Sequence, residues 1–463
     1  MATAPVTQPN HPPKSAHAAL PPGPRGHWLL GMLPEFRRDL LAMYHGAARQ
    51  YGDVVRIRFL NVDTFALSHP DLFKHVLQDN NRNYQRNAFF NSIVKATLGL
   101  NLFTADGDDW LSRRRLMQPA FHRQRIAAFG PLITDCVEAT LRRWERLPDG
   151  ARLEVDHEMM ALTLQVAGRA LFSVDLASEA SQLGDAFTHM SEYVNYRFNA
   201  PFAPPFWMPT PRNTLTRRAV ATVDQAIYAL IAERRRSGAE RDDLLGLLMA
   251  ARDADTGAAM TDQELRNEIG TFMFAGHETT AVTLTWAFYL LSQNPDAERR
   301  LHAELAEVLA GRAPTFEDLP RLAFTRRVVE ETLRLYPPAW GIARQAIDAV
   351  ELGGYRLPPA AGLTLLVMNV HRDPRFWDAP EQFDPDRFLP ERSEGRPHFA
   401  YLPFGGGPRL CIGNQFALTE AQLVLATLAQ RYTLRLVPGH PVRPNPIFVL
   451  RTSHGLPMTL TRR

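Results

Sequence analysis

The residue best suited to chemistry in this sequence is Cys411, which closes a glycine-rich stretch. Residues 404–413 read Phe-Gly-Gly-Gly-Pro-Arg-Leu-Cys-Ile-Gly, and the periodicity predicts an amphipathic helix directly after them. Because glycine and proline disfavour regular structure, we expect Cys411 behind a tight turn, at the N-terminus of that helix. Backbone N–H groups and the positive end of the helix dipole would favour a thiolate there. Gly413 would leave room for a large flat group against the helix.

Three other interpretations of Cys411 are open at this point. A free cysteine is often a small buried apolar residue. A nucleotide-binding loop is the second interpretation, but the spacing is not G-x-G-x-x-G and no lysine follows. A cysteine nucleophile of the protease type is the third, and it needs an activating histidine. None of these three interpretations explains why Phe, Arg and Gly residues surround the cysteine.

The whole stretch resembles the haem-ligand loop of the cytochrome P450 family, Phe-x-x-Gly-x-Arg-x-Cys-x-Gly, and meets every fixed position. The resemblance implies that Cys411 is the axial thiolate on the iron of haem b, a ligand that favours O–O cleavage. It also implies that Phe404 packs beside the sulfur and that Arg409 reaches a haem propionate. The fold it implies is mainly α with minor β, as one large triangular domain over residues 21–463.

A second motif lies in the middle of a long helix predicted over 261–293, where residues 275–280 read Ala-Gly-His-Glu-Thr-Thr. Gly and Thr are poor choices for a helix centre, and a packing notch is the simpler interpretation. The motif resembles the P450 pattern (Ala/Gly)-Gly-x-(Asp/Glu)-Thr-Thr. That resemblance implies that Ala275 and Gly276 let the helix approach the haem. It further implies that Thr279 holds a water chain where O2 is activated and that Glu278 helps to deliver protons. His277, at the variable position, receives no role.

A third motif is Glu331-Thr-Leu-Arg334 in a helical stretch. Taken alone, such a pair on one helix face is usually solvated and contributes little. In the P450 family the same Glu-x-x-Arg is buried and completed by a distant arginine, whose place is held here by Arg387. We therefore predict a structural triad of Glu331, Arg334 and Arg387 that fastens this helix to the loop carrying Cys411. Removing one partner of such a buried group costs about 3–5 kcal/mol.

Further residues are expected around the cofactor and the substrate. Trp110 and Arg114 are four apart on one helix face and resemble the family's Trp-x-x-x-Arg, which implies a contact with a haem propionate. Arg344 stands where the family often places another propionate contact, and His398 near the ligand loop is left without a role. The pocket is expected to be lined from four segments, although ordinary core packing explains each position equally well. Its predicted residues are Phe89, Phe90, Leu98, Leu102, Phe272, Ala275, Thr279, Ala339, Trp340, Ile342, Phe448 and Val449.

The resemblance predicts an enzyme that inserts one atom of O2 into an apolar molecule, such as a fatty acid, terpenoid, steroid or polyketide. We expect no fused flavin or nicotinamide domain, so electrons would come from a ferredoxin or flavodoxin-type donor with its reductase. Arg113, Arg115, Arg123 and Arg125 are usually explained as a solvated face, but could bind such an acidic donor. A peroxygenase that uses H2O2 and a non-catalytic haem sensor are the alternatives. Glu278 and Thr279 argue against both.

Composition narrows the class of protein. The chain has 463 residues and a formal net charge of +3, which does not suggest a nucleic-acid binder. Only Lys14, Lys74 and Lys95 are lysines, so Schiff-base chemistry is not expected. Two cysteines exclude a disulfide framework and a four-cysteine zinc site, and free thiols favour the cytoplasm. No run of about 18 or more apolar residues predicts a transmembrane anchor. The N-terminus lacks a charged segment followed by an apolar segment, so we expect no secretory signal. We expect a monomer.

The elements that must position these residues are mostly helical. Residues 1–20 are polar and rich in proline and alanine, and we expect a disordered tail. A hairpin is predicted over 54–59 and 64–68. Helices are predicted over 35–51, 122–146, 157–173, 213–236, 261–293, 296–310, 321–335 and 413–431, and short strands near 350–357, 363–367, 432–436 and 447–460. The proline and aromatic segment 199–211 is interpreted as a packed connection or a mobile lid.

Overall fold

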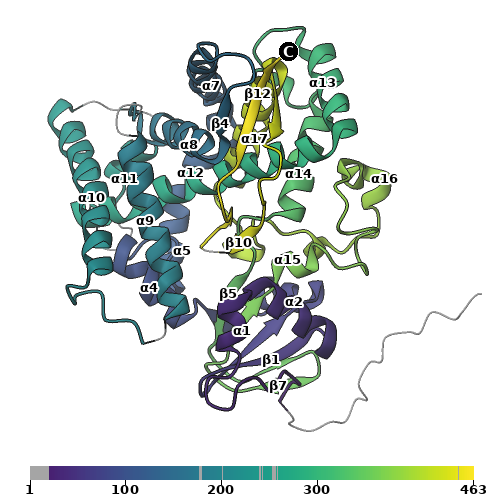
Figure 1. Cartoon of the computed structure of the whole chain (residues 1–463). Coiled ribbons are helices and arrows are strands. Elements are labelled where there is room, and N and C mark those ends of the chain that lie inside the picture. Colours follow the sequence, from purple (N-terminus) through teal and green to yellow (C-terminus); the bar gives the residue numbers. More distant parts are fainter. Residues whose placement is uncertain are drawn as a thin grey trace, which may run out of the picture.

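The computed structural model describes residues 20–176, 180–200, 202–238, 241, 243–252, 257, 259–446 and 448–463. The predicted tail, apart from Leu20, lies outside the described residues. Helices form most of the described chain, and the long helix α12 (Asp262–Gln293) packs against α8, α10, α14 and α17 (Figure 1). The predicted mainly α fold with minor β is therefore confirmed.

Besides α12, the α-helices are α1 (Leu33–Arg38), α2 (Leu40–Tyr51), α3 (Pro70–Lys74), α4 (Ala88–Leu98), α5 (Gly107–Met117), α6 (Arg123–Ala128), α7 (Gly130–Trp144), α8 (Val155–Phe172), α9 (Ala180–Asn199), α10 (Pro211–Ser237), α11 (Leu244–Ala250), α13 (Pro295–Leu309), α14 (Ala323–Leu335), α15 (Val367–Val370), α16 (Pro390–Ser393) and α17 (Asn414–Arg431).

The described strands form four small sheets. The largest has the order β1-β2-β8-β5-β3, in which only β2 and β8 run parallel. It lies beside α1 and α2 at the bottom of Figure 1. A second sheet has the order β4-β12-β9, and β6 with β7 and β10 with β11 form hairpins. The strands are β1 (Val54–Phe59), β2 (Val62–Leu67), β3 (Tyr84–Gln85), β4 (Arg152–Glu154), β5 (Ile342–Ala346), β6 (Val350–Leu352), β7 (Tyr355–Leu357), β8 (Gly362–Leu365), β9 (Tyr432–Leu436), β10 (Pro444–Pro446), β11 (Leu450–Thr452) and β12 (Pro457–Arg462).

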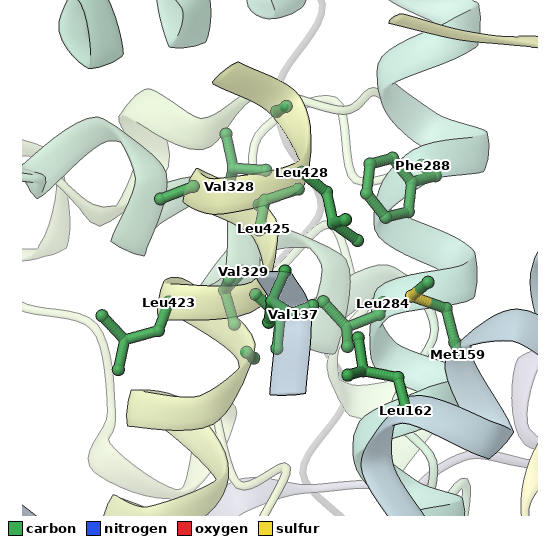
Figure 2. Close-up of a cluster of buried hydrophobic side chains, with 14 of the residues drawn as sticks. Val137, Met159, Leu162, Leu284, Phe288, Val328, Val329, Leu423, Leu425 and Leu428 are labelled. Carbon is green, nitrogen blue, oxygen red and sulfur yellow. The ribbon is translucent and has the colours of Figure 1, made fainter. Parts of the chain in front are cut away.

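One apolar cluster joins five helices that are far apart in the sequence. Leu284 and Phe288 of α12 meet side chains of α7, α8, α14 and α17, all buried (Figure 2). Burial of such side chains contributes about 1.5–3 kcal/mol each. The cluster therefore holds α12 in a fixed place relative to α14, which contains the Glu-x-x-Arg motif, and α17, which follows the Cys411 motif.

Two predicted helices are divided. The range 35–51 breaks at Asp39, which has an extended backbone and caps α2 by accepting the Ala42 N–H at 2.9 Å. The range 122–146 divides into α6 and α7, because proline at the start of α7 favours a new helix. Helix α9 lies where no helical range was predicted, although Leu183, Phe187, Met190 and Val194 are buried at helical spacing.

The connection between α9 and α10 is fastened by side chains of both helices. Arg197 donates to the Pro204 carbonyl at 2.8 Å, Asn213 donates to the Pro205 and Met208 carbonyls, and Arg217 donates to the Phe206 carbonyl. These bonds favour the packed connection over the mobile lid for residues 202–210. Among the described helices, none combines the length and apolar character that crossing a bilayer requires.

Candidate active site

A large cavity runs through the middle of the molecule, with a volume of about 2440 Å³. Cys411, Ala275 and Thr279 line it, so residues from the two main motifs face the same space. All twelve residues predicted for the substrate pocket also line it. Phe89 is half exposed at the surface, whereas Phe272 and Val449 are buried.

The Cys411 loop follows a course that only glycine permits. Gly405 and Gly407 have φ values of +73° and +65°, and a side chain at Gly407 would strike the Leu77 carbonyl oxygen. The Cys411 N–H donates to the Phe404 carbonyl at 3.0 Å, which closes the loop. Helix α17 begins only at Asn414, with Gly413 as its N-cap, so the cysteine precedes the helix by more than was expected.

Cys411 lines the cavity and is exposed to that space, although protein atoms surround it. Burial raises the pKa of its thiol, and this outweighs a hydrogen bond from the Gly413 N–H and the charge of Arg114. The loop and helix dipole alone therefore do not ionise the sulfur, contrary to the expectation from the sequence. A metal ion at the sulfur reverses this balance, because a coordinating thiol is deprotonated.

Positive charge gathers on one side of the cavity. Arg409 pairs with Asp106 at 2.6 Å and lies over the Trp110 ring, 4.4 Å from its centroid. Burial and neighbouring Arg409 lower the pKa of Arg344 to about 10. The pKa of Arg86 is lowered by burial and by both of these arginines. Three guanidiniums thus share one carboxylate, which leaves a site for anionic groups.

Arg86 is a cavity residue that the sequence analysis did not single out. Its guanidinium lies over the Phe103 ring, and its buried Nε has no hydrogen-bond partner among the described residues. Arg86 is the first residue of the segment 86–104, from which one wall of the pocket was predicted, and no other feature of the sequence indicated it. Arg114, on the other hand, was predicted and lines the cavity with its pKa lowered by burial.

The middle of α12 carries the second motif. Ala275, Gly276 and Thr279 line the cavity, and the Thr279 hydroxyl donates to the Ala275 carbonyl at 2.9 Å. A side chain at Gly276 would meet Ala167 and Leu171 of α8 at 3.6 and 3.7 Å. These are ordinary van der Waals distances, so the packing of α8 on α12 does not itself require glycine at this position.

Glu278 is turned away from the cavity lining. It is fully buried, and its carboxylate accepts from Arg451 Nε at 2.8 Å and from the Ser191 hydroxyl at 3.1 Å. Burial raises the pKa of this carboxyl above its ordinary value, and the charge of Arg451 and the hydrogen bonds from Arg451 and Ser191 offset only part of that rise. His277 is also buried and does not line the cavity, while His398 is exposed and lies outside it.

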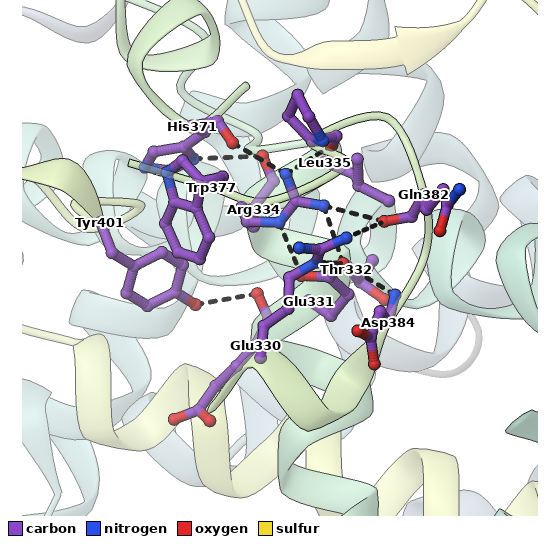
Figure 3. Close-up of polar contacts among 12 residues, drawn as sticks. Glu330, Glu331, Thr332, Arg334, Leu335, His371, Trp377, Gln382, Asp384 and Tyr401 are labelled. Carbon is purple, nitrogen blue, oxygen red and sulfur yellow. Dashed lines mark hydrogen bonds and ion pairs between the residues drawn. The ribbon is translucent and has the colours of Figure 1, made fainter. Parts of the chain in front are cut away.

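The Glu-x-x-Arg pair is buried and complete (Figure 3). Arg334 holds both oxygens of Glu331 at 2.6 and 2.7 Å, and Arg387 Nε donates to the same carboxylate at 3.2 Å. Arg334 also donates to the carbonyls of His371 and Pro380. His371 Nε2 accepts the Leu402 N–H at 3.0 Å. The three charged residues therefore connect α14 to the segment that leads into the Cys411 loop.

The predicted donor-binding arginines do not form one surface. Arg113 is mostly buried, because it pairs with Asp109 at 2.8 Å and with the buried Glu268 at 2.7 Å. Arg115 and Arg123 are exposed, whereas Arg125 is half buried. Arg113 is thus part of the interior, and the prediction that it contributes to a docking face was wrong.

Comparison with known proteins agrees with this geometry. The sequence profile of the family described as Cytochrome P450 matches residues 21–458. The chain is 42% identical over 399 residues to "Cyclooctatin synthase" of Streptomyces melanosporofaciens, covering 86% of each chain. It is 39% identical to "Cyclooctat-9-en-7-ol 5-monooxygenase" of the same organism, covering 84% of each. It is 36% identical to "Pentalenene oxygenase" of Streptomyces avermitilis, covering 89% of this chain and 91% of the other.

The chain belongs to the cytochrome P450 family. It is a haem-thiolate monooxygenase that acts on an apolar small molecule, and the bound haem supplies the activation of O2. The residues of this P450 fit the cofactor. Cys411 lines the cavity, and a side chain on Gly413 would meet only Phe121 among the described residues, at 3.8 Å. Three arginines, one of them with an Nε that has no partner in the described part of the chain, can bind anionic groups.

Proposed function

We propose that this P450 hydroxylates a cyclic terpenoid. The observation that carries the proposal is a single cavity that joins Cys411 and Thr279 to an apolar, aromatic wall. Phe90 stacks on Phe448 with ring centroids 5.9 Å apart, and Phe103 and Phe274 contact Phe448 edge to face. Such a wall suits a rigid hydrocarbon skeleton. The relatives named for cyclooctatin, cyclooctat-9-en-7-ol and pentalenene support this substrate class.

The residue roles follow from the positions described above. Cys411 binds the haem iron, and Arg86, Arg114, Arg344, Arg409 and Trp110 bind its propionates. Phe404 packs beside the sulfur, and Gly413 and Ala275 make room for the porphyrin. Thr279 holds water next to the substrate, and Glu278 serves as the buried proton reserve, held by Arg451 and Ser191.

Electrons come from a separate ferredoxin or flavodoxin-type protein with its reductase. Arg115 and Arg123 are the exposed arginines of the predicted patch, and acidic surfaces on such a donor would complement them. The free thiols of Cys136 and Cys411 favour a reducing compartment, and we place the enzyme in the cytoplasm as a monomer.

The test is an optical titration of the purified holoenzyme with pentalenene, cyclooctat-9-en-7-ol, lauric acid and progesterone. A terpenoid that fills the cavity displaces water from the iron and shifts the Soret band at lower concentration than the other two compounds. Product formation should require NAD(P)H, the donor and O2. A shift with lauric acid or progesterone alone, or turnover only with H2O2, overturns the proposal. The Cys411→Ala variant, which should lose the red-shifted carbon monoxide band, controls for the iron ligand.

A further inference from the structure

Three consecutive residues of α12 hold the chain segment 97–104 by its backbone. Arg266 donates to the Thr97 carbonyl at 3.0 Å, and Asn267 donates to the Leu100 carbonyl at 3.1 Å. Glu268 accepts the Leu102 N–H at 3.0 Å. These bonds join parts of the chain about 170 residues apart. The local sequence of either segment therefore does not predict them.

Glu268 also connects this segment to α5. Its other carboxylate oxygen accepts from Arg113 at 2.7 Å, and Arg113 in turn reaches Asp109. Glu268 is fully buried, and a buried carboxylate is costly unless it is paired on every side. An apolar contact would hold two elements together at lower cost. A charged pair adds what an apolar contact lacks, which is one fixed register between them.

The held segment is braced by hydrogen bonds of its own. Asn101 accepts the N–H groups of Phe103 and Thr104 at 2.9 and 3.0 Å, and the Thr104 hydroxyl donates to the Gly99 carbonyl at 2.9 Å. Gly99 has a φ of +72°, and a side chain there would lie 2.4 Å from Asn267 Oδ1. The α12 residues therefore set the position of the whole turn.

This turn forms one wall of the cavity. Leu98, Leu102 and Phe103 line it, and the Phe103 ring contacts both Phe90 and Phe448. Phe272, one turn after Glu268 on α12, lines the same space. A shift of the turn against α12 changes the distance between two walls that would enclose a substrate.

We propose that Glu268, with Asn267 and Arg266, is a positioning residue that sets the shape of the substrate pocket by fixing the 97–104 turn to α12 and α5. The proposal rests on the proposed function, because the wall matters only if the cavity takes an apolar substrate. It predicts that these residues control how well a bulky ligand fits, and leave the iron ligand and its cofactor in place.

The first test compares two ligands that bind the haem iron of the holoenzyme. Imidazole is a single small ring, whereas clotrimazole carries bulky aryl groups that we expect to reach the wall. In Glu268→Ala and Asn267→Ala, we expect the dissociation constant of clotrimazole to rise about tenfold or more, and that of imidazole to change less than about twofold. Glu298→Ala is the matched control, since Glu298 is a buried helical glutamate that pairs with Arg435 away from the cavity lining. It should move neither constant.

The second test uses a double-mutant cycle that needs no buried charge. Gly99→Ala should displace the turn because its side chain strikes Asn267, and in the Asn267→Ala background only the strain of the positive φ remains. Hydrogen exchange of the 98–104 amides in the holoenzyme is the measurement. We expect Gly99→Ala to speed exchange less in the Asn267→Ala background than in the wild type.

The outcomes separate the two levels of the argument. If wild-type protein binds neither azole through its iron, the proposed function fails. If it binds both, but the variants weaken imidazole and clotrimazole equally or not at all, the positioning role is wrong. Additive effects of Gly99→Ala and Asn267→Ala on exchange contradict it independently.

Discussion

Replacing Glu331 with glutamine keeps the shape of the side chain and removes the charge between Arg334 and Arg387. Glu331 and Arg334 are fully buried and Arg387 is 3% exposed, so water cannot take over the lost pairing. The carboxylate also accepts the Asp384 N–H at 2.9 Å. Breaking a buried group of this kind costs about 3–5 kcal/mol. At about 1.4 kcal/mol per factor of ten, this lowers the folding equilibrium constant by roughly two to four orders of magnitude.

The assay is urea unfolding of the reduced, carbon monoxide-bound enzyme, followed by the red-shifted absorbance and by far-ultraviolet circular dichroism. We expect the midpoint of Glu331→Gln to fall by about 1 M. The control is Glu298→Gln, whose partner Arg435 is 44% exposed and stays hydrated when the pair is lost, so its cost is about 1 kcal/mol or less. Equal midpoints in the two variants would refute the claim that burial makes the Glu331 group valuable.

The same substitution should loosen the cofactor. Arg334 holds the His371 carbonyl, His371 accepts the Leu402 N–H, and the Phe404 carbonyl accepts the Cys411 N–H. Disorder at Glu331 thus reaches the sulfur through three hydrogen-bonded steps. Haem transfer to apomyoglobin should be faster in Glu331→Gln than in Glu298→Gln. Unstable protein with unchanged haem transfer would show that the connection to the loop is not mechanical.

Three further predictions address the cavity, the pH response and the donor. Arg86→Leu should weaken haem retention about tenfold to a hundredfold in the apomyoglobin assay, because a charge-assisted bond is lost; unchanged retention would remove Arg86 from the site. Burial lowers the pKa of His277 to about 4, so the unfolded chain takes up its proton below pH 6.5 while the folded chain does not. Stability from this histidine is therefore present above pH 6.5 and is lost as the pH falls toward 4. The free energy of unfolding of the wild type should fall by about 2 kcal/mol between pH 7 and pH 5 because of this histidine. Urea midpoints of His277→Gln should not show this loss. Arg115→Glu with Arg123→Glu should slow stopped-flow reduction by a ferredoxin about tenfold at low salt, with the difference shrinking at high salt, whereas Arg236→Glu on α10 should not.

The sequence predicted those parts of the site that are written in contiguous strings. The Cys411 loop, the motif around Thr279 and the Glu331–Arg334 pair are local patterns, and periodicity located the helices that carry them. Arg387 could be assigned only because the resemblance supplied a distant partner. The position of Asp39 as a cap, which divides α1 from α2, depends on a single backbone angle that periodicity does not encode.

Contacts between distant segments could not be predicted in the same way. Arg86 joins the cavity because β3 pairs with β5 and brings it beside Arg344. Arg113 was assigned to a surface because its neighbours are charged, yet the buried Glu268 of α12 draws it inward. Glu278 was expected to help deliver protons, but its pairing with Arg451, from the last quarter of the chain and away from the cavity lining, could not be predicted. The position of each of these side chains depends on a charged or paired partner that is distant in the sequence.

The hydroxyl groups along α12 give the cavity a polarity of their own. Thr271, Thr279 and Thr283 line the cavity. The hydroxyl of each donates its hydrogen to the carbonyl four residues earlier, at 2.8 to 2.9 Å. A hydroxyl so engaged offers outward nothing but lone pairs. This flank of the cavity is therefore a row of acceptors, to which an alcohol can anchor by its own proton while a ketone finds no donor.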